Sequence, residues 1–90
     1  MVNVILTHEV KDFSIWKKGF DEGEPLRKKA GVKVNGVYTS FDNANFITLN
    51  LEFPGVKTVN EFMSNPELKA SMEQAGVVSV PEVKILKKVQ

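Results

Sequence analysis

The sequence predicts an α+β fold of the ferredoxin-like type, a four-stranded antiparallel sheet with the element order βαββαβ. Four short segments alternate between apolar and polar residues, as strands do, and two longer segments repeat apolar residues at helical spacing. Gly, Pro, Asn and Asp separate these segments. Because crossover connections are right-handed, we expect the strand order 4-1-3-2 with both helices on one face of the sheet.

The first strand is expected over residues 2–8, where the more apolar face belongs against the core. That face consists of Val2, Val4, Leu6 and His8. His8, the only histidine of the chain, is therefore predicted on the buried side at the last position of the strand.

The first helix should begin after Asp12, whose carboxylate can accept hydrogen bonds from the free amides of the first turn. Its buried face is aromatic and consists of Phe13, Trp16 and Phe20. Pro25 lacks the backbone N–H that a continuous helix uses, so the helix should bend or restart there. Gly31 is a natural C-terminal stop.

The second and third strands are predicted over residues 32–41 and 46–53, with a bulge at Asn35-Gly36 and a turn at residues 42–45. Whether the loop between these two strands has two or four residues, the predicted pairing of the strands is the same. Its pairs are Phe41 with Phe46, Tyr38 with Leu49, and Ser40 with Ile47. This register turns Tyr38 and Ser40 toward the helices.

The second helix is predicted in two parts, because Asn65-Pro66-Glu67 carries the signals of a new helix start. Its first part has a short apolar face that ends at Met63, and its second part continues to a stop at Gly76. The last strand is expected over residues 82–89.

Length and composition limit the class of protein. The 90 residues suffice for one domain, 1–90, with a modest core, and a formal net charge of +1 without a basic stripe argues against nucleic-acid binding. With no cysteine and one histidine, we expect no metal site and no cofactor. The first residues lack a positive n-region and a membrane-length apolar run, so a cytoplasmic protein that does not enter a membrane is expected.

The residue pattern also resembles a known superfamily. It reads His8-x-Val10-x-Asp12-Phe13-x-x-Trp16-Lys17-x-x-Phe20-Asp21-Glu22, then Arg27-x-x-Ala30-Gly31, then Phe62-x-x-Asn65-Pro66-x-Leu68-x-x-x-Met72-x-x-Ala75-Gly76-Val77 and Pro81. This looks like the dimeric α/β-barrel superfamily, and within it the small proteins related to antibiotic biosynthesis monooxygenases and cyclase-like proteins. The resemblance implies two sheets facing each other across a homodimer, with ligands between sheet and helices. Relatives often have histidine where this chain has Gly23, so any role of that histidine is absent here.

Topology gathers the candidate site at one end of the sheet. The first two strands run in the same direction, so His8 and the segment from Tyr38 to Ser40 should lie together where the first helix begins. We expect His8 and Tyr38 to be catalytic, since a histidine pKa of about 6.5 suits proton transfer near neutrality. Alternatively, His8 bonds only a backbone group, and Tyr38 only reaches water.

The expected ligand-binding residues are Trp16, Phe20, Ser40, Met63 and Met72. An aromatic ring such as that of Trp16 can stack on a flat ligand, and the methionines supply adaptable apolar walls. The alternative for Trp16 and both methionines is a place in the core. Arg27 is expected to be a solvated helix charge, with anion binding as its alternative.

Two functions fit these residues. The first is a cofactor-independent monooxygenase, cyclase or isomerase of a small, flat, oxygenated substrate such as a quinone-like aromatic. In this case His8 would move the proton, Tyr38 would orient the substrate, and Trp16 with Phe20 would form the wall. The second is a non-catalytic homodimer that carries or senses a small ligand. In both cases we expect dimerisation through the far sheet face, on which the predicted register gathers an unusual apolar patch. That patch consists of Ile5, Val37, Phe41 and Phe46.

Overall fold

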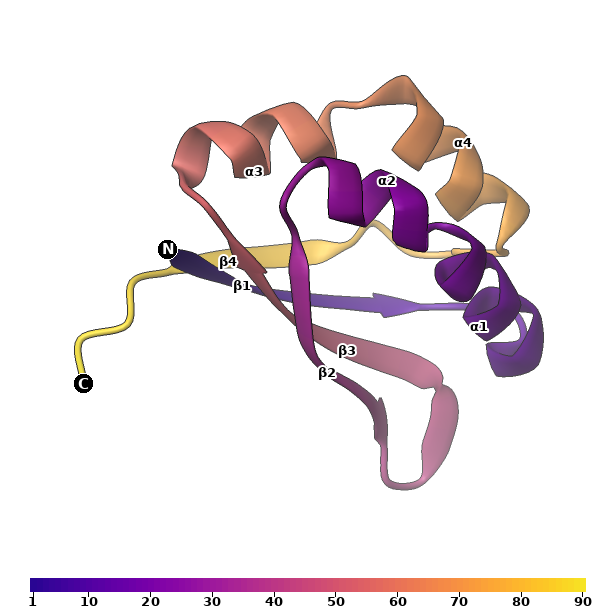
Figure 1. The fold of residues 1–90 in the computed structure, drawn as a ribbon. Helices are drawn as coiled ribbons and strands as arrows, with labels where there is room; N and C mark the ends of the chain where they lie inside the picture. Colours follow the sequence, from indigo (N-terminus) through magenta and orange to yellow (C-terminus); the bar gives the residue numbers. More distant parts are fainter.

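The computed structural model describes residues 1–90 and has the predicted fold, a four-stranded antiparallel sheet with all helices on one face (Figure 1). The strands are β1 (Val2–Glu9), β2 (Lys33–Ser40), β3 (Asn43–Phe53) and β4 (Glu82–Leu86). Their order is β2-β3-β1-β4, which confirms the predicted order read from the other edge. The last strand is shorter than expected and ends at Leu86.

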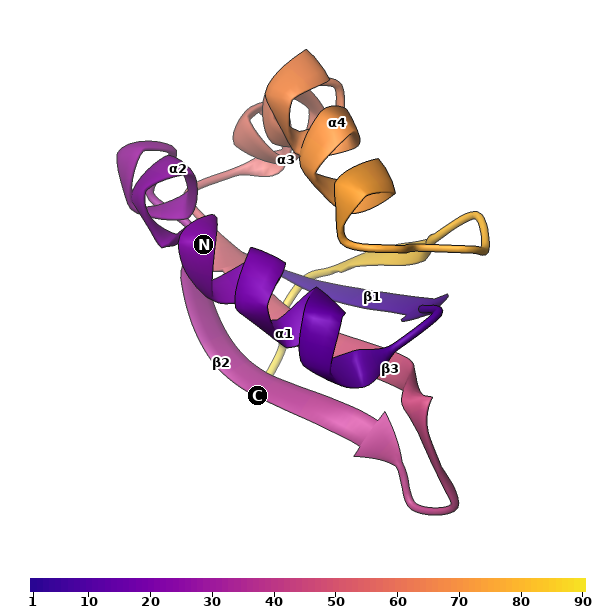
Figure 2. The same cartoon turned by 90° about the vertical axis from the view of Figure 1, so that its right-hand side faces the viewer.

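The helical layer consists of α1 (Phe13–Glu22), α2 (Glu24–Lys29), α3 (Val56–Met63) and α4 (Pro66–Gln74). Figure 2 shows α1 with α2 and α3 with α4 as two groups in the helical layer. The predicted break at Ser64-Asn65 is confirmed, and the restart expected at Pro25 occurs slightly earlier, with the break at Gly23 and Pro25 in the first turn of α2. Each pair is therefore two short helices joined at a break, and not one continuous helix.

Local hydrogen bonds explain where the helices begin and end. The Asp12 carboxylate accepts from the backbone N–H of Ser14 at 2.9 Å and of Ile15 at 3.2 Å, so Asp12 is the N-cap of α1. The side chain of Asn65 caps α4 in the same way. Gly31 follows α2 with a φ of 76°, a left-handed conformation that glycine adopts without strain.

The core lies between the sheet and the helices, and the alternation along the two central strands produces it. The buried strand residues are Val4, Leu6, Ile47, Leu49, Leu51 and Phe53. Trp16 from α1 and Phe62 from α3 pack onto them. His8 shares this face because it pairs with Ile47, and it is the only polar residue among the buried ones.

The predicted register of the β2–β3 hairpin is wrong by one residue. Tyr38 pairs with Thr48, and its neighbours Val37 and Thr39 pair with Leu49 and Ile47. The connecting turn is Phe41-Asp42, and the second irregularity in pairing lies between Thr39 and Ser40. The first irregularity is the predicted bulge at Asn35-Gly36, which is confirmed.

Asn45 gives a physical reason for the shifted register. Its backbone carbonyl accepts from the N–H of Val10 at 2.8 Å, and its side-chain oxygen accepts from the N–H of Phe13 at 2.9 Å. These bonds tie the start of β3 to the connection between β1 and α1. The extra β3 residues around Asn45 are needed to reach that connection, so the pairing slips and the faces of Tyr38 and its neighbours exchange.

The corrected register changes the far face of the sheet. Val37 packs against the core on the helix side, and Phe41 is fully exposed at the tip of the hairpin, so neither joins the expected patch. Ile5 and Phe46 lie on the far face as predicted, and Tyr38 joins them. No helix covers this face in Figure 1.

Candidate functional site

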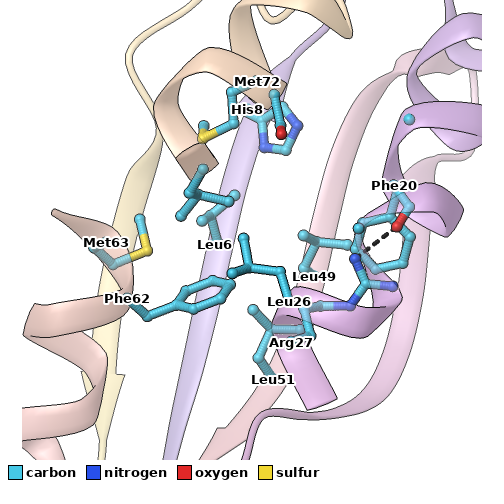
Figure 3. Close-up of a pocket in the computed structure, with 14 residues that line it drawn as sticks. Leu6, His8, Phe20, Leu26, Arg27, Leu49, Leu51, Phe62, Met63 and Met72 are labelled. Carbon is cyan, nitrogen blue, oxygen red and sulfur yellow. Dashed lines mark hydrogen bonds between the residues drawn. The ribbon is translucent and has the colours of Figure 1, made fainter. Parts of the chain in front are cut away.

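A cavity of about 90 Å³ lies between the sheet and the helical layer, and it is the candidate site (Figure 3). From the sheet it is lined by Leu6, His8, Leu49 and Leu51. From α1, α2 and their junction it is lined by Gly19, Phe20, Gly23, Leu26 and Arg27. From α3 and α4 it is lined by Phe62, Met63, Leu68, Ser71 and Met72. The walls are mostly apolar, with His8 and Arg27 as the ionisable groups.

The cavity lies next to the seam between α1 and α4. A shallow groove on that seam shares three lining residues with the cavity, Gly19, Gly23 and Ser71. A Cβ atom on Gly19 would lie 3.2 Å from the Cβ of Ala75, so the two helices already approach closely on one side of these residues. We call Gly19, Gly23 and Ser71 the mouth of the cavity.

His8 is the central feature of the lining. Its side chain is only 3% exposed, and neither Nδ1 nor Nε2 has a hydrogen-bond partner. Burial lowers the pKa of the imidazole below its ordinary value of 6.5, because the charged form loses its hydration. The neutral ring therefore presents one donor and one acceptor, both unused, next to an apolar cavity.

A series of neighbouring rings supports one wall of the cavity. The His8 and Trp16 ring centroids are 5.7 Å apart, and the Trp16 and Phe20 rings stack with centroids 4.9 Å apart. Phe20 faces the cavity, whereas Trp16 is buried behind it and does not line the cavity. Trp16 thus holds His8 and Phe20 in place from the core side.

Arg27 continues this series at its other end. Its guanidinium carbon lies 3.9 Å from the centroid of the Phe20 ring, and Nη1 donates to the Phe20 carbonyl at 2.6 Å. Arg27 is only half-buried, and desolvation lowers its pKa, with the charges of Glu24 and Asp21 opposing that effect. The aromatic face and the carbonyl at the end of α1 fix the position of the cation.

The structure brings together four of the expected site residues and separates three. His8, Phe20, Met63 and Met72 line the cavity, and Figure 3 shows Met72 beside His8 and Met63 beside Phe62. Trp16 lies behind the wall.

Tyr38 and Ser40 do not lie on the helix-facing side of the sheet near His8, where the sequence predicted them. Tyr38 lies on the sheet face opposite His8, because the register is one residue away from the predicted one. Ser40 is at the hairpin end, where its hydroxyl bonds the Asp42 carboxylate at 2.9 Å. Neither residue lines the cavity that His8 lines.

Sequence reasoning underestimated Arg27 and missed the mouth. Arg27 was expected to be a solvated helix charge, with anion binding as the alternative. The available signal was Gly23, where the helix breaks and the last carbonyls of α1 become free to accept a hydrogen bond. Ser71 carries no sequence signal, because its position at the mouth depends on how α1 and α4 pack.

No helix of the structure is long and apolar enough to cross a membrane. The structure also holds no group of three or more His, Cys, Asp or Glu side chains placed to bind a metal ion together.

Comparison with known proteins supports the fold. No protein-family model and no curated protein matches the chain, but solved structures do. A candidate antibiotic biosynthesis monooxygenase from Nitrosomonas europaea has a TM-score of 0.77 at 10% identity, covering 100% of both chains. Another from Bordetella bronchiseptica has a TM-score of 0.78 at 18% identity, covering 99% of this chain and 97% of that one.

A NIPSNAP domain protein from Burkholderia xenovorans also matches, with a TM-score of 0.73 at 13% identity, covering 99% of this chain and 95% of that one. The chain thus has the same fold as structures described as antibiotic biosynthesis monooxygenases and as a NIPSNAP domain protein, as the resemblance in sequence implied. At these identities the likeness establishes the fold, and the chemistry has to be argued from the cavity.

Proposed function

We propose that the cavity binds a small, flat, oxygenated molecule and that His8 takes a proton from it, as a cofactor-independent monooxygenase, cyclase or isomerase would require. The observation that carries this proposal is the pair of unpartnered nitrogens on a buried histidine. Buried polar groups nearly always have a hydrogen-bond partner, and leaving one without costs about 1–3 kcal/mol. A ligand hydroxyl or carbonyl in the cavity would satisfy His8.

The size of the cavity limits the ligand. A cavity of roughly 150 Å³ accommodates benzene, and this one measures about 90 Å³. A ligand with a single ring therefore fits only if an adaptable wall moves. Met63 and Met72 are suited to that, because an unbranched thioether side chain changes rotamer at little cost.

Because its pKa is lowered, His8 is neutral near pH 7 and can act as the proton acceptor. A neutral imidazole can accept a proton from a phenol, an enol or an activated C–H group, leaving the ligand as an anion. Isomerisation or cyclisation needs only that proton to move and return. In monooxygenation the anion would react with O₂, so that a ring CH₂ becomes C=O and the second oxygen atom leaves as water without an external reductant.

A second function, a non-catalytic carrier or sensor, is favoured by one specific observation. Tyr38 lies on the other face of the sheet, so His8 is left with no other polar side chain of the expected catalytic set. A protein that only binds needs no second catalytic group. Turnover therefore decides between the two functions, and binding alone does not.

The test is a screen of one-ring phenols, hydroquinones and cyclic enols with no cofactor added. It follows O₂ uptake and substrate absorbance for wild type, His8→Ala and Tyr38→Phe. We expect turnover by wild type, a loss of about a hundredfold or more in His8→Ala, and no change in Tyr38→Phe. Equal rates in wild type and His8→Ala would remove His8 from the chemistry. Binding of a compound without turnover would favour the carrier.

We also propose that the protein is a homodimer with the far sheet face as its interface. Phe46 is 44% exposed there, and Ile5 and Tyr38 lie on the same uncovered face. The side-chain oxygen of Asn50, also on this face, is buried and has no hydrogen-bond partner. A facing sheet would cover the apolar groups and could donate to this oxygen.

A further inference from the structure

We propose that Arg27 is the anion-binding residue of the cavity, and that the ligand is therefore a monoanion, a phenolate, enolate or carboxylate. This inference rests on the proposed function and adds to it the charge of the ligand. In the proposed chemistry, proton transfer to His8 creates a negative charge inside an apolar cavity. Such a charge requires a cation nearby, and Arg27 is the cation among the lining residues.

Arg27 makes no salt bridge in the structure. The salt bridges are Lys17 with Asp21 and Lys84 with Glu82. Lys17 contacts both oxygens of Asp21, at 2.6 and 2.8 Å, so that carboxylate is already paired, and Glu24 acts on Arg27 only from beyond salt-bridge distance. Of the hydrogen-bond donors of the guanidinium, only Nη1 has a protein acceptor, the Phe20 carbonyl. The remaining donors are free for a ligand.

The guanidinium is also held in one place. Its central carbon lies over the Phe20 ring, 3.9 Å from the centroid, and the hydrogen bond to the Phe20 carbonyl fixes it to the end of α1. A cation fixed before the ligand arrives stabilises a developing anion without having to reorganise. A purely structural role would need the carbonyl bond alone. It would not explain why the cation is half-buried at the wall of the cavity that His8 lines.

His8 and Arg27 line different parts of the cavity, so each can have its own role. Figure 3 shows His8 next to Met72 and Arg27 beneath Phe20, with Leu49 and Leu26 between them along the lining. One flat, conjugated ligand can therefore face Phe20 with its acidic C–H or O–H group toward His8 and a conjugated oxygen toward Arg27. His8 accepts the proton, and the negative charge that remains is delocalised onto the oxygen at Arg27.

Two one-ring probes test the inference, 4-nitrophenol, which ionises, and nitrobenzene, which does not. The phenolate of 4-nitrophenol absorbs visible light, so the ionisation of the bound probe is measured directly in a pH titration. The proteins are wild type, Arg27→Gln, Arg27→Lys and Lys28→Gln. Lys28 is exposed on the same helix, so Lys28→Gln matches Arg27→Gln in net charge and controls for long-range electrostatics.

In wild type we expect the bound 4-nitrophenol to have a pKa roughly one unit below that of the free phenol. Arg27→Gln should abolish this shift and weaken phenolate binding roughly tenfold, while nitrobenzene binding changes less than about twofold. Arg27→Lys should keep most of the shift, and Lys28→Gln all of it. Circular dichroism verifies that each variant is folded.

Two results would overturn the inference while leaving the proposed function intact. In the first, Arg27→Gln binds the phenolate as tightly as wild type does. In the second, it loses both probes equally, as expected if Arg27 only supports the wall. If wild type binds neither probe, the proposed function fails, and the assignment of Arg27 fails with it.

Discussion

Gly23 and Arg27 share one space at the junction of α1 and α2. A Cβ atom on Gly23 would lie 3.1 Å from Nη1 of Arg27, the atom that donates to the Phe20 carbonyl. Gly23 has a φ of −80° and a ψ of 0°, which any residue can adopt, so the backbone does not require glycine. The space occupied by the guanidinium is what disfavours a side chain at position 23.

This relationship predicts that Gly23→Ala and Arg27→Ala are coupled. In the Arg27→Ala background, Gly23→Ala should stabilise the protein by about 0.5–1 kcal/mol, because alanine costs less backbone entropy than glycine. In wild type the gain should be smaller by about 0.5 kcal/mol or more, because the guanidinium has to move and its hydrogen bond to Phe20 weakens. Urea unfolding of the four proteins gives the coupling energy, and strict additivity would contradict a shared space.

Because His8 is buried, we expect the free energy of unfolding to decrease in mild acid. Its folded pKa lies below the unfolded value of 6.5, so below pH 6.5 the unfolded state binds more protons than the folded state. The free energy of unfolding should therefore fall as the pH decreases from about 6.5 toward the folded pKa, and should be independent of His8 above pH 7. Urea unfolding between pH 5 and 7.5 measures this.

The matched variant for this pH series is His8→Phe, which fills a similar volume and cannot titrate. Its stability should change less over the same range, since carboxylates titrate mainly below pH 5. Parallel curves for wild type and His8→Phe would show that the imidazole is not desolvated in the folded state.

The hairpin register predicts which cysteine pair can form a disulfide. The chain has no cysteine, so introduced thiols have no competitors. Tyr38 pairs with Thr48, and directly opposite residues in an antiparallel pair have Cα atoms about 4.5–5.5 Å apart, within disulfide range. Tyr38→Cys with Thr48→Cys should therefore oxidise within one chain, whereas Tyr38→Cys with Leu49→Cys should not. Mass spectrometry of the two oxidised variants distinguishes them, and the opposite outcome would restore the register expected from the loop length.

If the far sheet face is the dimer interface, a charged side chain introduced there should prevent dimerisation. Wild type should sediment as a dimer at micromolar concentration, and Phe46→Lys should shift it to a monomer, because a lysine covered by a facing sheet would lose its hydration without a partner. Ile15→Lys is the control, since Ile15 is also an exposed apolar residue, 59% exposed, but lies on α1. A wild-type monomer, or equal dissociation by both lysines, would exclude this interface.

The helix boundaries could be predicted from the sequence because the interactions that set them are local. Asp12 caps amides two and three residues ahead, Asn65 caps one two residues ahead, and Gly31 adopts a left-handed φ at the end of α2. The strand order followed equally well, since handedness leaves few topologies for this element order.

The hairpin register and half of the site could not be predicted, because they depend on distant contacts. Asn45 bonds residues more than 30 positions earlier in the chain, and that connection decides which face Tyr38 takes. His8 was placed correctly because the alternation of β1 is uninterrupted. The place of Arg27 depends on the break at Gly23 and on the ring of Phe20, which become neighbours of the guanidinium only in the folded chain.

The mouth of the cavity has a consequence for kinetics. Its three residues, Gly19, Gly23 and Ser71, place at most two heavy side-chain atoms at any one position, so the side chains that have to move for a ligand are the flexible ones of the groove, such as Lys18 and Glu22. Association should then be limited by these movements and by the adjustment of the methionine walls, and the lifetime of a complex by the contacts made inside. We therefore expect rapid ligand exchange, which would suit repeated turnover or rapid sensing better than long-term storage.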